Sequence, residues 1–127
     1  MHELSITESI LRTCLAEARR QNALRIRIIR LRLGPFSGIV PECIQMYLEL
    51  LAEGTIAEGA RIEAVTAPLQ VRCRDCGRES RITRRHIACP HCGSLRLQIL
   101  SANEFMIESM EVDTDGNQSA SPGHGME

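Results

Sequence analysis

Two Cys-x-x-Cys pairs, separated by twelve residues, constrain this chain more than any other feature of its sequence. The pairs are Cys73-Arg-Asp-Cys76 and Cys89-Pro-His-Cys92. Such pairs can place four thiolates at the corners of a tetrahedron, each pair forming a tight loop whose backbone N–H groups point at the sulfurs. Gly77 and Gly93 follow the second Cys of each pair, where this turn often needs a positive φ angle. The spacing therefore predicts a structural zinc site with four cysteine ligands.

Two other uses of these cysteines remain open, namely a pair of disulfides and a rubredoxin-like iron site. The apolar N-terminal segment is interrupted by Glu8, Arg12 and Glu17, which is not typical of a secretory signal. No run approaches the ~20 apolar residues of a membrane-spanning helix. We therefore expect a cytoplasmic protein without a membrane partner. In that reducing compartment the six cysteines stay thiols or bind metal, which disfavours the disulfides.

The composition limits the size of the core and the kind of partner. A length of 127 residues suits one domain, or one domain with a small module that depends on a metal. Of the residues, 43% are hydrophobic, but only Phe36, Tyr47 and Phe105 are aromatic, so the core must be aliphatic. The net charge of -1 gives no general attraction to nucleic acid or to an anionic membrane.

Two helices are predicted from apolar stripes at helical spacing. The first covers residues 5–21, with a capping-box pattern at Ser5-Ile-Thr-Glu8 and a stop at Asn22. Its apolar stripe includes Cys14, which we interpret as a small core residue. The second helix covers residues 41–53, with Pro41 suited to its first turn and Gly54 to its end.

Three strands are predicted outside the cysteine module, at residues 24–33, 61–66 and 104–112. In the first, the apolar alternation breaks at Ile28-Ile29, where a β-bulge would keep the apolar side inward. The last strand follows the cysteine module, so the most economical arrangement pairs all three strands and treats the module as an insertion. The predicted fold class is α+β: two helices on a three-stranded sheet, with an inserted four-cysteine zinc ribbon.

The predicted domain organisation follows from this insertion. An α+β domain comprises residues 1–67 plus 103–112, a zinc-ribbon domain comprises 68–102, and a polar tail over 113–127 is predicted to be disordered. Short β segments are expected at 69–72, 82–87 and 95–100. Because the ribbon contains little apolar material, the metal must supply much of its folding free energy. His86 and His91 lie in the ribbon, and we assign both to its surface.

A second metal-binding pattern stands at the start of the chain, which reads Met1-His2-Glu3-Leu4. Since His2 is not small, Met1 should keep its free amine. That amine, the amide nitrogen of His2 and its Nδ1 can close fused chelate rings around a metal, with Glu3 completing the set through its amide nitrogen or carboxylate. Planar nitrogen donors of this kind suit Ni(II) or Cu(II). A histidine at position 2 also occurs by chance, so this pattern alone assigns no site.

Several segments together resemble the HypA/HybF family of hydrogenase nickel-incorporation proteins. They are Met1-His2-Glu3-Leu4-Ser5, Gly34 followed by Pro41-Glu42, the Cys73 to Ser94 ribbon, and the closing run from Glu104 to Val112. The resemblance implies a nickel metallochaperone that serves the [NiFe]-hydrogenase large subunit precursor with a HypB-type GTPase. It also implies transient Ni(II) at Met1, His2 and Glu3, and structural Zn(II) at Cys73, Cys76, Cys89 and Cys92. The family commonly has Gly before its last strand, where this chain has Ala102-Asn103.

A different class of function is also compatible with the ribbon. Its seven arginines against two acidic residues would suit a zinc-ribbon module that binds nucleic acid or protein. The ribbon has no aromatic residue to stack a base, so we expect no nucleic-acid partner. No nucleophile–base pair or carboxylate dyad can be identified, so we expect no enzyme. A homodimer is left open by the sequence.

Overall fold

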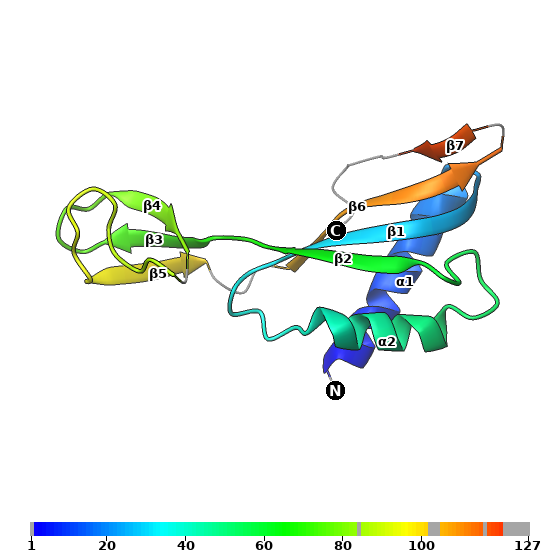
Figure 1. Ribbon diagram of the computed structural model, residues 1–127, viewed down its shortest axis with the longest axis horizontal. Coiled ribbons are helices and arrows are strands. Elements are labelled where there is room, and N and C mark those ends of the chain that lie inside the picture. The colour runs from blue at the N-terminus through cyan, green and yellow to red at the C-terminus, as the bar shows by residue number, and fades with distance from the viewer. Residues whose placement is uncertain (1, 84, 102–104, 116, 121–127) are drawn as a thin grey trace. The chain divides into compact units, whose positions relative to one another are not determined.

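The computed structural model describes residues 2–83, 85–101, 105–115 and 117–120, with only the backbone at His2 and at 117–120. The chain falls into two compact units (Figure 1). One comprises the described residues of Met1–Arg32, Ile39–Val65 and Met106–Glu127, and the other those of Leu33–Gly38 and Thr66–Phe105. The sequence-based division placed 33–38 in the first domain. Here this segment groups with the ribbon, in which the Ala67 N–H donates to the Leu33 carbonyl at 2.6 Å.

The first unit contains two helices and a four-stranded sheet. The helices are α1 (His2–Arg20) and α2 (Pro41–Leu51), and the sheet has the order β2-β1-β6-β7 (Figure 1). The strands are β1 (Ala23–Leu33), β2 (Arg61–Thr66), β6 (Phe105–Thr114) and β7 (Asn117–Ala120). The three predicted strands are therefore neighbours, and the predicted α+β fold class is confirmed. The fourth strand, β7, comes from the segment that was expected to be disordered. It pairs antiparallel with β6. Residues 121–127 of that tail lie outside the described residues.

An aliphatic core fills this unit, as the shortage of aromatic residues required. Fully buried apolar side chains come from both helices and from the two central strands: Ile10, Cys14, Ala18, Ile26, Ile29, Leu31, Ile44, Leu48, Met110 and Val112. Asn22 has a φ of 56°, the left-handed conformation that commonly ends a helix, so the predicted stop is confirmed. The helix begins earlier than predicted, at His2 instead of Ser5. The Thr7 hydroxyl is fully buried and donates to the Glu3 carbonyl at 2.5 Å, within the added turn.

The second unit is the ribbon, a three-stranded antiparallel sheet with the order β4-β3-β5. The strands are β3 (Leu69–Cys73), β4 (Glu79–Ile82) and β5 (Leu97–Ser101). In the register of this sheet, Val71 of the central strand pairs with Ser80 on one side and Ile99 on the other. Strand β4 begins earlier than the β segment predicted at 82–87. The turn that carries the first cysteine pair returns the chain directly onto β3, so pairing starts at Glu79.

None of the helices that the structure describes has the length and apolar character needed to cross a bilayer.

Candidate metal centres

The two cysteine pairs form two turns of the same design, which we call the first knuckle (Cys73–Gly77) and the second knuckle (Cys89–Gly93). In each, the glycine N–H donates to the carbonyl of the first cysteine, at 2.9 Å in the first knuckle and 2.8 Å in the second. Gly77 and Gly93 have φ angles of 79° and 78°, as the sequence predicted. The left-handed residue turns the chain so that both cysteines of a pair face the same side.

Backbone N–H groups point at the sulfurs inside each knuckle. The Sγ of Cys73 accepts from the N–H groups of Asp75 and Cys76 at 3.3 and 3.4 Å. The Sγ of Cys89 accepts from the N–H of His91 at 3.4 Å. Such hydrogen bonds stabilise a thiolate more than a thiol, so each knuckle is built to hold ionised sulfur.

The structure brings the four predicted zinc ligands together. Their sulfurs all lie within 4.8 Å of one another. Between the knuckles, the Sγ of Cys73 lies 3.6 Å from that of Cys92, and the Sγ of Cys76 lies 3.7 Å from that of Cys89. A Zn–S bond of about 2.3 Å gives a tetrahedral S–S edge of about 3.8 Å. All six cysteines are free, and these separations are far from a disulfide bond length of about 2.0 Å.

The pKa values of the four thiols divide the cluster: those of Cys73 and Cys89 are lowered, and those of Cys76 and Cys92 are raised. The N–H of Cys76 is the main cause that lowers the pKa of Cys73, to about 6. At Cys92, the N–H of Ser94 favours the thiolate, but the neighbouring sulfur of Cys73 and burial oppose it and raise the pKa to about 12. A divalent cation among the sulfurs favours the ionised form of all four. The donor set and its geometry therefore fit a tetrahedral metal site.

Polar side chains also link the two knuckles to each other, which the sequence did not reveal. The Ser94 hydroxyl donates to Asp75 Oδ2 at 2.5 Å, and Arg96 Nη1 donates to Asp75 Oδ1 at 2.7 Å. Arg78 Nη1 lies 3.1 Å from His91 Nδ1. The arginine side chain has only hydrogen-bond donors, so His91 Nδ1 accepts this hydrogen bond from Arg78. The sequence pointed to the cysteines but gave no reason to connect the residues between and after them.

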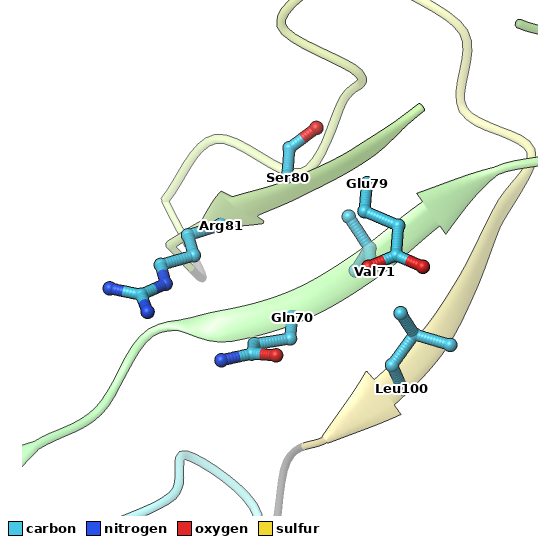
Figure 2. Close-up of a pocket in the computed structure, with 6 residues that line it drawn as sticks. All are labelled: Gln70, Val71, Glu79, Ser80, Arg81 and Leu100. Carbon is cyan, nitrogen blue, oxygen red and sulfur yellow. The ribbon is translucent and has the colours of Figure 1, made fainter. Parts of the chain in front are cut away.

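The ribbon has a further hollow on its sheet, shown in Figure 2. The cavity of about 260 Å³ is lined by Gln70, Val71, Glu79, Ser80, Arg81 and Leu100. Glu79 also forms an ion pair with Arg72 across the strands. This lining contains neither a cysteine nor a histidine, so it offers no soft metal ligand and no histidine base for Ser80.

Two of the predicted nickel ligands, His2 and Glu3, are the first residues of α1. Met1 and the side chain of His2 lie outside the described residues, and the backbone of His2 is helical. A hydrogen bond from its own backbone N–H, and a further one from that of Val40, lower the pKa of Glu3, so its carboxylate is a charged oxygen donor. The first four N–H groups of a helix have no acceptor within the helix. The amide nitrogen of His2 is therefore not required by the hydrogen bonds of α1.

The remaining two cysteines belong to the first unit and to neither metal pattern. Burial raises the pKa of Cys14 to about 12, so this thiol is an inert core group, as the sequence predicted. Cys43 is partly exposed in the first turn of α2.

Comparison with known proteins identifies close relatives over nearly the whole chain. The family described as hydrogenase/urease nickel incorporation, metallochaperone, HypA matches residues 1–112. A hydrogenase maturation factor HypA from Dehalococcoides mccartyi is 39% identical over 119 residues, which cover 94% of this chain and 100% of the relative. One from Alkalilimnicola ehrlichii is 40% identical over 113 residues, which cover 89% of this chain and 100% of the relative.

Two solved structures share the fold. The solution structure of the Ni metallochaperone HypA from Helicobacter pylori is 21% identical, with a TM-score of 0.61, and the match covers 89% of this chain and 98% of that one. A solution structure of a HypA protein is 23% identical, with a TM-score of 0.64, and covers 88% of this chain and 96% of that one.

The family consists of metallochaperones and maturation factors, which confirms the expectation that the chain is not an enzyme. The match begins at residue 1 and ends at residue 112, so it includes both cysteine pairs and the N-terminal pattern. The sequence resemblance is thereby confirmed: this chain belongs to the HypA family of hydrogenase and urease nickel-incorporation metallochaperones.

Proposed function

We propose that this chain binds Ni(II) through Met1, His2 and Glu3 and delivers it, in the cytoplasm, to the large subunit precursor of a [NiFe]-hydrogenase. A HypB-type GTPase is the proposed partner, as the family resemblance implies. The chain itself has no Walker-type Gly-Lys-Ser/Thr sequence to bind the phosphates of GTP. The observation that carries this proposal is the family match from residue 1 to residue 112, which covers both metal patterns in one chain.

The two sites suit different tasks. Cys73, Cys76, Cys89 and Cys92 would hold Zn(II) in a closed set of four thiolates, which has no open position for a substrate or a second ligand set. When bound, this zinc supplies cross-links that fold the ribbon. The N-terminal chelate would be open on one side, so ligands of a recipient can enter while those of the donor leave.

Selection of nickel cannot rest on affinity alone. In the Irving–Williams order Cu(II) binds nitrogen ligands more tightly than Ni(II), so metal supply and partner proteins must decide which ion is loaded. Release can be driven by protons, because the imidazole of His2 and the terminal amine must both be deprotonated to bind.

The test is His2→Ala in the tag-free protein, with His86→Ala as the matched control. His86 is an exposed histidine of the ribbon, so its loss removes an imidazole without touching the N-terminus. After equilibrium dialysis against Ni(II) and Zn(II), metal analysis should show that His2→Ala loses stoichiometric nickel and keeps its zinc. The control should keep both metals. Tight nickel binding by His2→Ala would overturn the N-terminal assignment.

A further inference from the structure

The two knuckles are related by an approximate two-fold repeat, and their side-chain links follow it. Counted from the first cysteine of each knuckle, Asp75 corresponds to His91, and Arg78 corresponds to Ser94. The third residue of the first knuckle bonds to the residue after the second knuckle, as Asp75 does to Ser94. The third residue of the second knuckle bonds to the residue after the first, as His91 does to Arg78. The same contact is therefore made twice, in opposite directions.

The placement of these links matters because two short sulfur–sulfur contacts join one knuckle to the other. Cys73 pairs with Cys92 and Cys76 with Cys89, at 3.6 and 3.7 Å. Within a knuckle, the turn's own hydrogen bonds fix the two cysteines. Between knuckles, the strands and the side-chain links must fix the distance. A metal held by four thiolates can leave only when at least one Zn–S bond opens, and separating the knuckles opens two.

We propose that Asp75 and Arg78 are positioning residues that latch the two knuckles together and slow the release of the metal from the four cysteines. The proposal rests on the proposed zinc site. We call the contacts of Asp75 with Ser94 and Arg96 the Asp75 latch, and the contact of Arg78 with His91 the Arg78 latch. The Asp75 latch is the stronger of the two, because the carboxylate accepts two hydrogen bonds whose lengths are typical of charge-assisted hydrogen bonds. The backbone supports it, since the Arg74 N–H donates to the Arg96 carbonyl at 2.8 Å.

The experiment measures the rate at which zinc passes from the full-length protein to an excess of the chromogenic chelator 4-(2-pyridylazo)resorcinol. Removal of residues that hold metal ligands in place typically weakens binding by about 10–100-fold. We expect Asp75→Ala to release zinc about tenfold faster than the wild type, and Asp75→Ala combined with Arg78→Ala to release it faster still. Ser94→Ala removes the hydrogen bond to Asp75 and the one that the Ser94 hydroxyl accepts from the Arg96 N–H at 3.0 Å. It leaves the Asp75–Arg96 side-chain pair, so its rate should lie between wild type and Asp75→Ala.

Glu79→Ala is the matched control. Glu79 is also an exposed carboxylate of the ribbon paired with an arginine, but its partner Arg72 lies on the neighbouring strand and not in the other knuckle. Its zinc release should match the wild type. Replacement of zinc by Co(II) should give the same tetrahedral thiolate absorption bands in all variants, which shows that the ligands are unchanged.

Each outcome bears on a separate claim. Equal rates for Asp75→Ala and wild type would overturn the latch, as would an equal acceleration by Glu79→Ala, which would indicate general loss of ribbon stability. If Asp75→Ala cannot be loaded with zinc, the zinc-release rate of Ser94→Ala is compared with the rates of wild type and Glu79→Ala instead. A rate equal to that of wild type would then overturn the latch. A wild-type protein that holds no zinc when purified and reloaded would instead overturn the proposed zinc site.

Discussion

At the scale of single residues, the knuckles depend on two glycines in the left-handed region. Gly77 has a φ of 79°, and a Cβ built on it would meet nothing within 4 Å. The cost of any other residue there is therefore one of backbone conformation, about 1–2 kcal/mol for an L-residue in this region. The sequence predicted this conformation because a glycine follows the second cysteine of each pair.

Gly77→Ala should weaken zinc binding. If metal binding requires the folded knuckle, a backbone cost of about 1–2 kcal/mol lowers the affinity by roughly 5–30-fold. Competition with a chelator of known affinity measures this change. Gly54→Ala is the matched control, because Gly54 has a φ of 82° with equally empty surroundings but lies after α2. It should destabilise the α+β unit and leave zinc affinity unchanged; equal zinc affinities in the two variants would contradict the argument.

The apolar residues of β1 show that a sequence pattern does not decide which side chain of an adjacent pair is buried. The apolar alternation of β1 was expected to break at Ile28-Ile29. In the structure the buried positions pass from Ile26 to Ile29, so the phase does change at this pair, with Ile29 buried and Ile28 only partly buried. Leu24 is 61% exposed and takes no part in the core. A run of adjacent apolar residues allows several break points, and only packing against the helices selects one.

At the scale of elements, ion pairs tie the central strand to both of its neighbours. Arg30 of β1 donates to Glu111 of β6 at 2.7 Å and to Glu63 of β2 at 3.1 Å. Arg27 adds a longer pair with Glu111, at 3.7 Å. Arg27 and Arg30 therefore neutralise acidic side chains of the same sheet, as expected of the solvated face of a half-buried strand.

The stability of the sheet should depend on the charge of Glu111. The hydrogen bond from Arg30 lowers the pKa of Glu111 below its ordinary value of 4.5, so the folded state favours the carboxylate. This contribution is fully present above the unfolded pKa and is lost as the pH falls through the folded pKa. Urea unfolding across this acidic range should show that the stability difference between wild type and Glu111→Gln shrinks as the pH falls. Arg30→Met should remove the same pH dependence, whereas a difference that stays constant with pH would contradict the assignment.

Sequence patterns located the elements but not all of their ends. The capping-box pattern at Ser5 predicted the start of α1 too late, because residues before it also adopt helical geometry and Thr7 bonds back to Glu3. The clustering of the four cysteines, by contrast, was predictable, because the spacing of two Cys-x-x-Cys pairs brings their sulfurs together. The latches were not, because the partner of Asp75 depends on how two turns face each other.

At the scale of the whole molecule, the two units differ greatly in the cores that stabilise them. The α+β unit buries apolar side chains from both helices and from its central strands. The core of the ribbon consists of Leu69, Val71 and Ile82, with Leu97 packed against it. The free energy gained by burying so few side chains cannot offset the loss of conformational entropy when a segment of this length is ordered. A metal bound by the four cysteines would supply the difference.

Removal of zinc should unfold the ribbon and leave the α+β unit folded. Hydrogen exchange measured by mass spectrometry, with and without a strong chelator, should show loss of protection across β3, β4 and β5. The peptides of α1 and β1 should keep their protection, because none of the described residues of these two elements belongs to the four-cysteine cluster. Cys76→Ser should reproduce the effect of the chelator, whereas Cys43→Ser, which removes a cysteine outside the cluster, should not. If β3 stayed protected after zinc was removed, four apolar side chains would suffice for its fold, and the metal would have only a local role.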